Sequence, residues 1–202
     1  MFFKFLKKYR IIISVSYVIA LLFLFITSDA IWQENGLVDT ILTCIGILMI
    51  GFSVFGRLWA SVYISGYKQK KLITVGPYSL VRNPLYFFSF IGAIGVGCVS
   101  ESLLMLSLIV VPFVCIYPFV IIAEERKLFI EFGALFREYM KTTPRFLPNF
   151  KKVSDPEHYE VSTRIYHRKI FEAMWFFWFY GILEVVEALH QSGVLPIILK
   201  IP

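Results

Sequence analysis

The sequence is poor in charge and in cysteine, and both shortages exclude whole classes of protein. Only 17% of its 202 residues are charged, whereas a typical soluble domain has about 25%. Intrinsic disorder is excluded, because it requires low hydrophobicity together with high net charge. Three cysteines are too few for a disulfide scaffold. Cys44, Cys98 and Cys115 lie in apolar stretches without a Cys-x-x-Cys pair or clustered histidines, so no metal site is expected.

Common nucleotide-binding and hydrolase motifs are also missing. No Gly-x-Gly-x-x-Gly motif follows a strand-like segment, and no Gly-x-Ser-x-Gly motif is present. Gly92, Gly95 and Gly97 instead lie in an apolar run, where small residues let helices approach closely. The net charge of +6 is not accompanied by a motif for RNA or DNA binding, so nucleic acid is not an expected partner.

Long hydrophobic runs dominate what is present. Apolar residues make up 58% of the chain and the mean hydropathy is +0.72. Four runs predict membrane-spanning helices, at residues 11–27, 37–64, 85–99 and 103–123. The first run lacks a small-x-small cleavage pattern, which favours an uncleaved helix over a signal peptide.

Beyond residue 123, the fourth run continues as an amphipathic helix that should end before Thr143-Pro144. Residues 168–190 predict either a fifth span, which is the preferred interpretation, or a helix lying in the membrane interface. The predicted fold class is all-α, a polytopic integral membrane protein with four to five transmembrane helices. Residues 1–150 should form its core, and residues 151–202 a polar linker with a membrane-associated or transmembrane helix.

Lysine and arginine are distributed unevenly among the connections. Of the 20 positive residues, four precede the first span, five lie within residues 57–82 and ten within residues 126–169. The connections at residues 28–38 and 100–102 contain none. Under the positive-inside rule, the basic face is cytoplasmic. We therefore expect a multi-pass protein whose functional site faces the cytoplasm.

The first candidate site on this face extends from Lys70 to Tyr86. Gly76-Pro77 is a turn signal, and Asn83-Pro84 reads as a helix N-cap followed by proline at the first helical position. The free N–H groups and positive dipole end of that helix suit a ligand with carboxylate or hydroxyl groups. The alternative is a membrane-entry loop with lysine and tyrosine anchors.

The second candidate is the pair Glu124-Glu125 at the end of the fourth run. The two acids either mark the boundary with water, or face the bundle interior and bind or react with a ligand there.

Taken in order, these motifs resemble a known family. The isoprenylcysteine carboxyl methyltransferases and their relatives, the phospholipid methyltransferases, are similar to this chain over residues 40–150. The similarity lies in Arg57-Leu-Trp-Ala, Gly76-Pro77-Tyr78, Val81-Arg82-Asn83-Pro84-x-Tyr86, Glu124-Glu125-x-x-Leu128, Phe132-Gly133 with Tyr139, and Pro144-Arg145-Phe146-Leu147-Pro148.

The resemblance implies an integral membrane enzyme that uses S-adenosylmethionine (SAM) without a Rossmann domain. It also implies a cofactor pocket open to the cytoplasm and a lipid substrate that arrives from the bilayer. Glu124 and Arg82 are the catalytic residues it implies. The cofactor-binding residues it implies are Lys70, Lys71, Leu72, Ile73, Tyr78, Asn83, Pro84, Leu85 and Tyr86.

Two positions depart from the family pattern. Asn83 replaces the usual histidine, so a hydrogen-bonding group is kept but a titrating imidazole is not. Val120 stands where the prenylcysteine enzymes carry an arginine that holds the substrate carboxylate. The second departure argues against a prenylcysteine substrate more than against methyl transfer.

The expected function is therefore SAM-dependent methylation of a membrane-embedded lipid or lipidated substrate. The closest activity is that of protein-S-isoprenylcysteine O-methyltransferase. Three alternatives stay open: a phospholipid amine N-methyltransferase, an NADPH-dependent membrane reductase on a similar scaffold, and a non-enzymatic membrane scaffold. In the reductase, Lys68, Lys70 and Lys71 would hold the extra phosphate.

The charge distribution predicts the topology. A cysteine introduced at Glu34 should react with a membrane-impermeant reagent added from outside, and a cysteine at Lys152 should react only after permeabilisation. The unmodified protein, whose three cysteines lie in apolar runs, is the control. The reverse labelling pattern would contradict both the orientation and a cytoplasmic site.

Overall fold

The computed structural model describes residues 2–30, 36–65, 71–150 and 153–201, so Glu34, Lys68, Lys70 and Lys152 lie outside the described residues. The elements are α1 (Phe2–Thr27), β1 (Ser28–Ala30), α2 (Gly36–Ile64), α3 (Pro77–Leu80), α4 (Pro84–Val99), α5 (Leu103–Phe132), α6 (Ala134–Thr142), α7 (Thr163–Ala173), α8 (Trp175–Gln191) and β2 (Leu199–Ile201).

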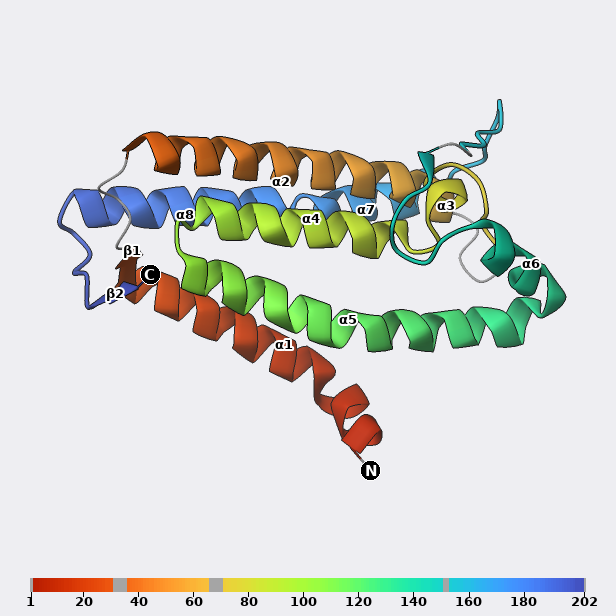
Figure 1. The fold of residues 1–202 in the computed structure, drawn as a ribbon, viewed down its shortest axis with the longest axis horizontal. Helices are drawn as coiled ribbons and strands as arrows, with labels where there is room; N and C mark the ends of the chain where they lie inside the picture. The colour runs from red at the N-terminus through yellow and green to blue at the C-terminus, as the bar shows by residue number, and fades with distance from the viewer. Residues whose placement is uncertain (1, 31–35, 66–70, 151–152, 202) are drawn as a thin grey trace.

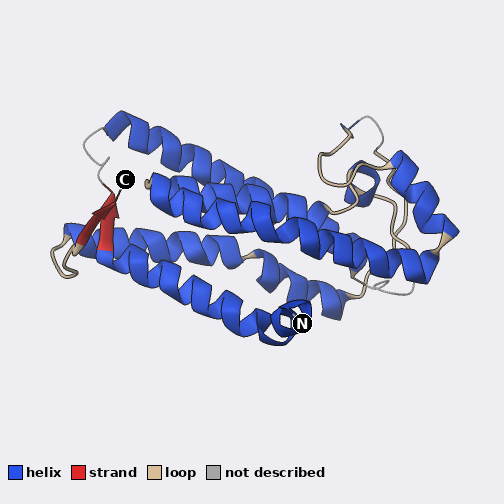
Figure 2. Cartoon of the chain, turned by 60° about the horizontal axis from the view of Figure 1, so that its bottom comes forward, coloured by secondary structure: helices blue, strands red, loops and turns tan. Residues whose placement is uncertain are grey.

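The long helices lie lengthwise beside one another and form one elongated bundle. α2, α4 and the α7–α8 pair lie together, and α5 and α1 lie along one side of them (Figure 1). One end of the bundle, the α6 end, carries α3, α6 and the loops between α6 and α7. The opposite end carries the parallel pair β1–β2, in which Ser28 lies opposite Leu199 (Figure 2).

The closest helix contact in the bundle joins α2 to α4, because both helices place glycine at the crossing. A Cβ atom at Gly46 would lie 2.7 Å from the carbonyl oxygen of Gly95, and one at Gly95 would lie 2.8 Å from the carbonyl oxygen of Gly46. Any side chain larger than hydrogen would force the two backbones apart. The glycines are therefore used for packing, as the sequence predicted for the third apolar run.

The outer surface of the bundle is apolar. α2 and α5 are long and apolar enough to cross a membrane, and α4 and residues 15–27 are shorter apolar helices. Large side chains such as Leu48, Phe55 and Phe119 are well exposed on these helices. A continuous apolar exterior of this kind suits lipid rather than water. The chain is thus an all-α membrane protein, whereas the number of crossings and their orientation stay predictions.

Helices form at all the runs where the sequence predicted them, with two differences in detail. The helix expected to continue to residue 142 is interrupted at Gly133, whose φ of 51° lets the chain turn from α5 into α6. The C-terminal helix breaks at Met174 into α7 and α8. The short β1–β2 pair was not predicted, because three-residue strands carry too little periodicity to detect.

The C-terminal helices pack into the bundle. Ala173, at the end of α7, is 1% exposed. Leu183 of α8 packs with Ile50 of α2 and Val99 of α4. α8 thus lies along two apolar helices, and the interpretation of this segment as a fifth span stays a prediction.

The glycine contact between α2 and α4 generates a stability prediction. Gly46→Ala should lower the free energy of unfolding by about 1–3 kcal/mol, the usual cost of overpacking. Gly51→Ala is the matched control, because a Cβ atom there would meet nothing within 4 Å. Thermal unfolding of both variants in detergent tests the difference. Equal midpoints would show that the two backbones separate without cost.

Candidate active site

Glu125 of α5 joins three separate segments at the α6 end of the bundle. Its Oε1 accepts hydrogen bonds from Arg82 Nε and Asn83 Nδ2, both at 3.1 Å. Its Oε2 accepts from Arg145 Nε at 3.1 Å and forms an ion pair with Arg145 Nη2 at 3.0 Å. The side chain is 7% exposed. The two cations and the amide donor compensate the burial of this carboxylate.

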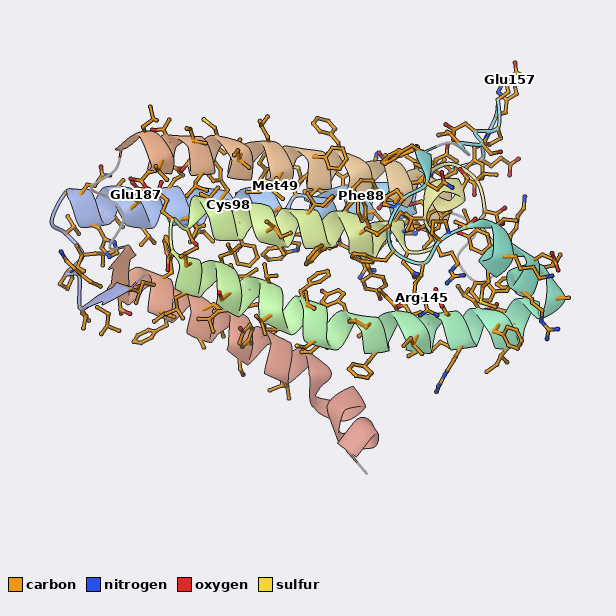
Figure 3. The ribbon with its side chains drawn as sticks, viewed as in Figure 1. Met49, Phe88, Cys98, Arg145, Glu157 and Glu187 are labelled. Atoms are coloured by element: carbon orange, nitrogen blue, oxygen red, sulfur yellow. The ribbon has the colours of Figure 1, made fainter. Side chains whose placement is uncertain are left out.

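Further hydrogen bonds fix the loop after α6 onto the chain between α3 and α4. Arg82 donates from its backbone N to Pro144 O at 2.8 Å, and from Nη1 to Met140 O at 3.1 Å. Asn149 N donates to Leu80 O at 2.9 Å. Figure 3 shows Arg145 within this region and Glu187 at the far end of the molecule. Leu80 and Arg82, in the second half of the first candidate site, are thus held against α6 and the loop that follows it.

The turn at Gly76-Pro77 requires glycine. Gly76 has a φ of 61°, and a Cβ atom there would lie 2.5 Å from the ring of Tyr63. The turn is tied to the C-terminal segment, since Gly76 N donates to Ser154 O at 2.8 Å and Ser154 N donates to Ser79 Oγ at 3.1 Å. The chain that follows α6 therefore also positions the start of α3.

Tyr78 follows this turn and is buried, and its hydroxyl has no hydrogen-bond partner among the described residues. Burial raises the pKa of this hydroxyl well above its ordinary value, and the nearby Tyr139 and Glu124 raise it further. The group therefore stays protonated as a potential donor. Its backbone oxygen, by contrast, accepts from Tyr139 OH at 2.6 Å.

Several predicted cofactor residues come together around Tyr78. Ile73 and Leu85 pack against the cluster that Ala60, Tyr63 and Tyr78 form. The remaining predicted residues line the same stretch: Lys71 is exposed, Leu72 and Tyr86 are half-buried, and Pro84 is buried at the first position of α4. Lys70 lies outside the described residues.

Asn83 occupies the N-cap position of α4, and the predicted proline follows it. Its side chain makes no capping hydrogen bond. It donates instead to Glu125 and to the carbonyl oxygen of Arg145, the latter at 3.1 Å. The position of Asn83 at the helix N-terminus was predicted correctly. Its side chain, however, joins α4 to α5 and to the loop after α6 and does not cap the helix.

Of the two acids, Glu124 is exposed and Glu125 is buried. Glu124 still lies within electrostatic range of the Tyr78 hydroxyl. Sequence reasoning selected Glu124 and Arg82, and missed the roles of Glu125 and Arg145. The sequence did contain a signal for Arg145. This arginine lies in the motif Pro144–Pro148, which occurs together with the acid pair in the resemblance to the methyltransferase family.

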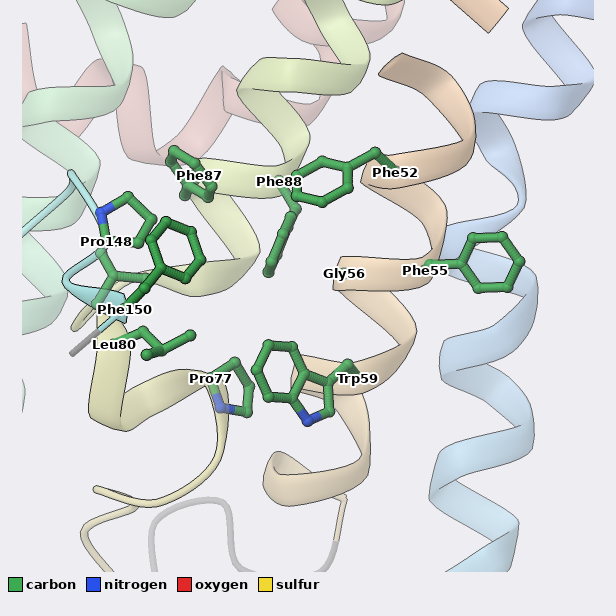
Figure 4. A pocket seen from close by; sticks show the side chains of 11 residues that line it. Phe52, Phe55, Gly56, Trp59, Pro77, Leu80, Phe87, Phe88, Pro148 and Phe150 are labelled. Carbon is green, nitrogen blue, oxygen red and sulfur yellow. The ribbon is translucent and has the colours of Figure 1, made fainter. Parts of the chain in front are cut away.

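An apolar cavity of about 280 Å³ lies beside the candidate site, between α2, α3 and α4. In Figure 4, Trp59 of α2, Phe88 of α4 and Leu80 of α3 surround one space. The lining residues are Phe52, Phe55, Gly56, Trp59, Pro77, Leu80, Val81, Phe87, Phe88, Pro148 and Phe150. Phe52 and Phe150 are more than half exposed, so the cavity has an apolar rim.

Comparison with known proteins identifies the class to which this arrangement belongs. The family model described as phospholipid methyltransferase matches residues 37–134, which include α2 through α5 and the acid pair. The chain belongs to the family of isoprenylcysteine carboxyl methyltransferases and phospholipid methyltransferases. It is thus a membrane methyltransferase that acts on lipid-type substrates.

Two relatives match almost the whole chain. The nickel-cobalt-cadmium resistance protein NccN of Alcaligenes xylosoxydans xylosoxydans is 32% identical over 199 residues, which cover 98% of this chain and 92% of the relative. The cobalt-zinc-cadmium resistance protein CzcN of Cupriavidus metallidurans is 35% identical over 196 residues, which cover 95% and 88%. No solved structure matches the chain.

The position of Glu125 predicts a large effect on stability. Glu125→Gln should lower the free energy of unfolding by about 3–5 kcal/mol, since it leaves partly buried arginines without their counter-charge. It should also expose residues 143–150 to protease. Glu138→Gln is the control, because its exposed pair with Lys141 should contribute no more than about 1 kcal/mol. If the two variants unfold alike and resist protease alike, Glu125 does not hold the segments together.

Proposed function

We propose that the protein transfers the methyl group of SAM to a lipid or lipidated acceptor in the bilayer, a reaction most like that of protein-S-isoprenylcysteine O-methyltransferase. The observation that carries the proposal is the Glu125 network. It ties Arg82 and Asn83 to α5 and to the loop after α6, next to the buried Tyr78 hydroxyl, which has no partner among the described residues.

The residues around Tyr78 fit the cofactor chemically. A buried donor that lacks an acceptor costs about 1–3 kcal/mol, and a hydroxyl or carboxylate of the cofactor would recover that energy. Ile73 and Leu85 add an apolar surface next to it, and Lys71, Leu72, Asn83, Pro84 and Tyr86 would complete the site, largely through backbone groups. SAM, when bound, supplies a methyl group already activated on a sulfonium. The protein's own task is to orient the acceptor and exclude water.

Glu124 and Arg82 have different tasks in this proposal. Glu124 lies at the exposed side of the site near Tyr78 and would hold a cationic acceptor or take its proton. A carboxylate acceptor would need no base. Arg82 donates from its side chain to Glu125 and to Met140 O. It would therefore position Asn83 and the start of α4 as a fixed cation.

The apolar cavity supports a substrate with a hydrocarbon chain. Its lining is aromatic and aliphatic, and Phe52 joins its exposed rim to the apolar exterior of α2. We propose that part of the acceptor chain enters here from the bilayer, while the reacting group reaches the α6 end. That end carries the basic connections, which would place it in the cytoplasm.

A phospholipid amine is the second candidate acceptor, because the matching family model is that of the phospholipid methyltransferases. The names of the two relatives concern resistance to metal ions. We base the proposal on the methyltransferase match and not on those names.

The first test is cofactor binding by calorimetry. The purified protein should bind SAM, whereas binding of NADPH alone would indicate a reductase and binding of neither would indicate a scaffold. Tyr78→Phe should weaken SAM binding roughly threefold to tenfold, the value of one neutral hydrogen bond. The same change should not lower the unfolding temperature without SAM, since the hydroxyl has no partner there. Tyr166→Phe, a half-buried position on α7, is the matched control.

The second test is single-turnover methyl transfer to a lipid extract. Glu124→Gln should still bind SAM but lose transfer, and its pH profile should flatten if the acceptor is an amine. Wild-type rates in Glu124→Gln would remove this residue from the chemistry without affecting the assignment of the cofactor site.

A further inference from the structure

Arg57 is a half-buried cation of the bundle, about two helical turns before the end of α2 at Ile64. Its Nη1 donates to Ser89 Oγ of α4, and its Nη2 lies 3.4 Å from the carbonyl oxygen of Glu172 on α7. The guanidinium also lies over the ring of Phe176, 5.7 Å from the centroid. Its Nε is buried and unpartnered within the described part of the chain.

Among the described residues, no carboxylate neutralises this guanidinium directly. Arg57 forms no ion pair with any described residue, and the Glu172 carboxylate is engaged by Lys169 and by Arg168 at 3.7 Å. Glu172 therefore affects Arg57 only at longer range. A charge that is partly withdrawn from water in an apolar bundle and has no counter-charge is costly, and such charges are kept where they have a function.

A second unsatisfied group lies on the same face of α2. Ser53, one turn before Arg57, has a hydroxyl that is buried and has no partner among the described residues. That hydroxyl faces α4, because a Cβ atom at Gly92 would lie 2.4 Å from it. Buried polar atoms are nearly always paired. The unpaired Ser53 Oγ and Arg57 Nε therefore point to a polar ligand group in the α2–α4 seam, the contact region around Ser53, Arg57 and Ser89.

The seam borders the candidate active site. Arg57 interacts electrostatically with Tyr117 of α5. The Tyr117 ring packs edge-on against that of Tyr86, with centroids 5.4 Å apart. Tyr86 is one of the predicted cofactor residues, and it lies one turn before Ser89, the hydrogen-bond partner of Arg57. Tyr117 and Tyr86 thus connect the surroundings of Arg57 to the start of α4.

We infer that Arg57 binds the oxyanion of the membrane acceptor, a carboxylate or a phosphate, and so selects anionic amphiphiles over neutral ones. A guanidinium matches such groups because it donates several parallel hydrogen bonds. The inference rests on the proposed function for the identity of the acceptor. The anion-binding role itself does not require that methyl transfer occurs.

Native mass spectrometry of the full-length protein in neutral detergent tests this binding directly. The carboxylate probes are farnesylthioacetic acid and its primary amide. The phosphate probes are phosphatidylglycerol and diacylglycerol with the same chains. The wild type should prefer the anionic member of at least one pair by about tenfold or more, the value of a hydrogen bond to a charged group. The pair that shows the preference identifies the source of the oxyanion.

Arg57→Gln should abolish this preference, and Arg57→Lys, which keeps the charge but loses the planar fork, should retain part of it. Arg164→Gln, at an exposed position on α7, is the matched control and should bind as the wild type does. A folded Arg57→Gln with the full preference would overturn the inference, and so would a wild type that binds both members equally. If Arg57→Gln does not fold, an undiminished preference in Arg57→Lys would also overturn it.

The calorimetric test separates this inference from the proposed function. A protein that fails to bind SAM but shows the Arg57-dependent preference would refute the methyltransferase proposal and leave the anion site standing. In an active enzyme, Arg57→Gln should raise the KM for an anionic acceptor while the Kd for SAM is unchanged. Equal turnover of anionic and neutral acceptors by the wild type would overturn the anion site alone.

Discussion

The buried carboxylate of Glu125 organises the α6 end of this protein. Three segments distant in sequence, at Arg82-Asn83, Glu125 and Arg145, meet at its two oxygens. A carboxylate so deeply buried is stable only while its cations remain, and the cations in turn hold the loop after α6 against α3 and α4. The start of α4 is positioned by this arrangement, and contacts with Ser154 and Tyr139 fix the Gly76 turn and Tyr78 beside it. The cofactor surface we propose is therefore a product of tertiary contacts and not of one continuous motif.

The helices supply the scaffold for this end. Glycine at the crossing of α2 and α4 brings the two backbones into direct contact, and the α7–α8 pair packs along both. The same bundle has an apolar exterior and a few polar groups inside. Among these, Arg57 is unusual because it forms no ion pair with a described residue, and the carboxylate of the nearby Glu172 pairs with Lys169. A membrane enzyme for lipid acceptors needs both features, an exterior that lipid solvates and a polar interior where charge is recognised.

The comparisons and the structure support different parts of this account. The family match covers α2 through α5 and establishes the class of reaction. The two metal-resistance relatives extend the similarity over nearly the whole chain. The part beyond residue 134 contributes Ser154, in the chain between α6 and α7, next to the Gly76 turn, and Glu172 and Phe176, in α7 and α8, next to Arg57. The segment beyond the family match thus belongs to the same structural unit as the site.

The sequence alone determined the helices, because long apolar runs and their proline, glycine and charged boundaries are local properties. It also determined the motifs around Tyr78 and Asn83, which carry the resemblance to a methyltransferase family. It did not show that the Asn83 side chain would donate to Glu125 instead of capping α4. Nor did it show that the buried member of the acid pair is Glu125 rather than Glu124. Nor did it show that Arg57 lacks a carboxylate partner. Adjacent residues on a helix point about 100° apart, so burial and pairing depend on how α4, α5 and the loop after α6 pack together, which only the tertiary structure decides.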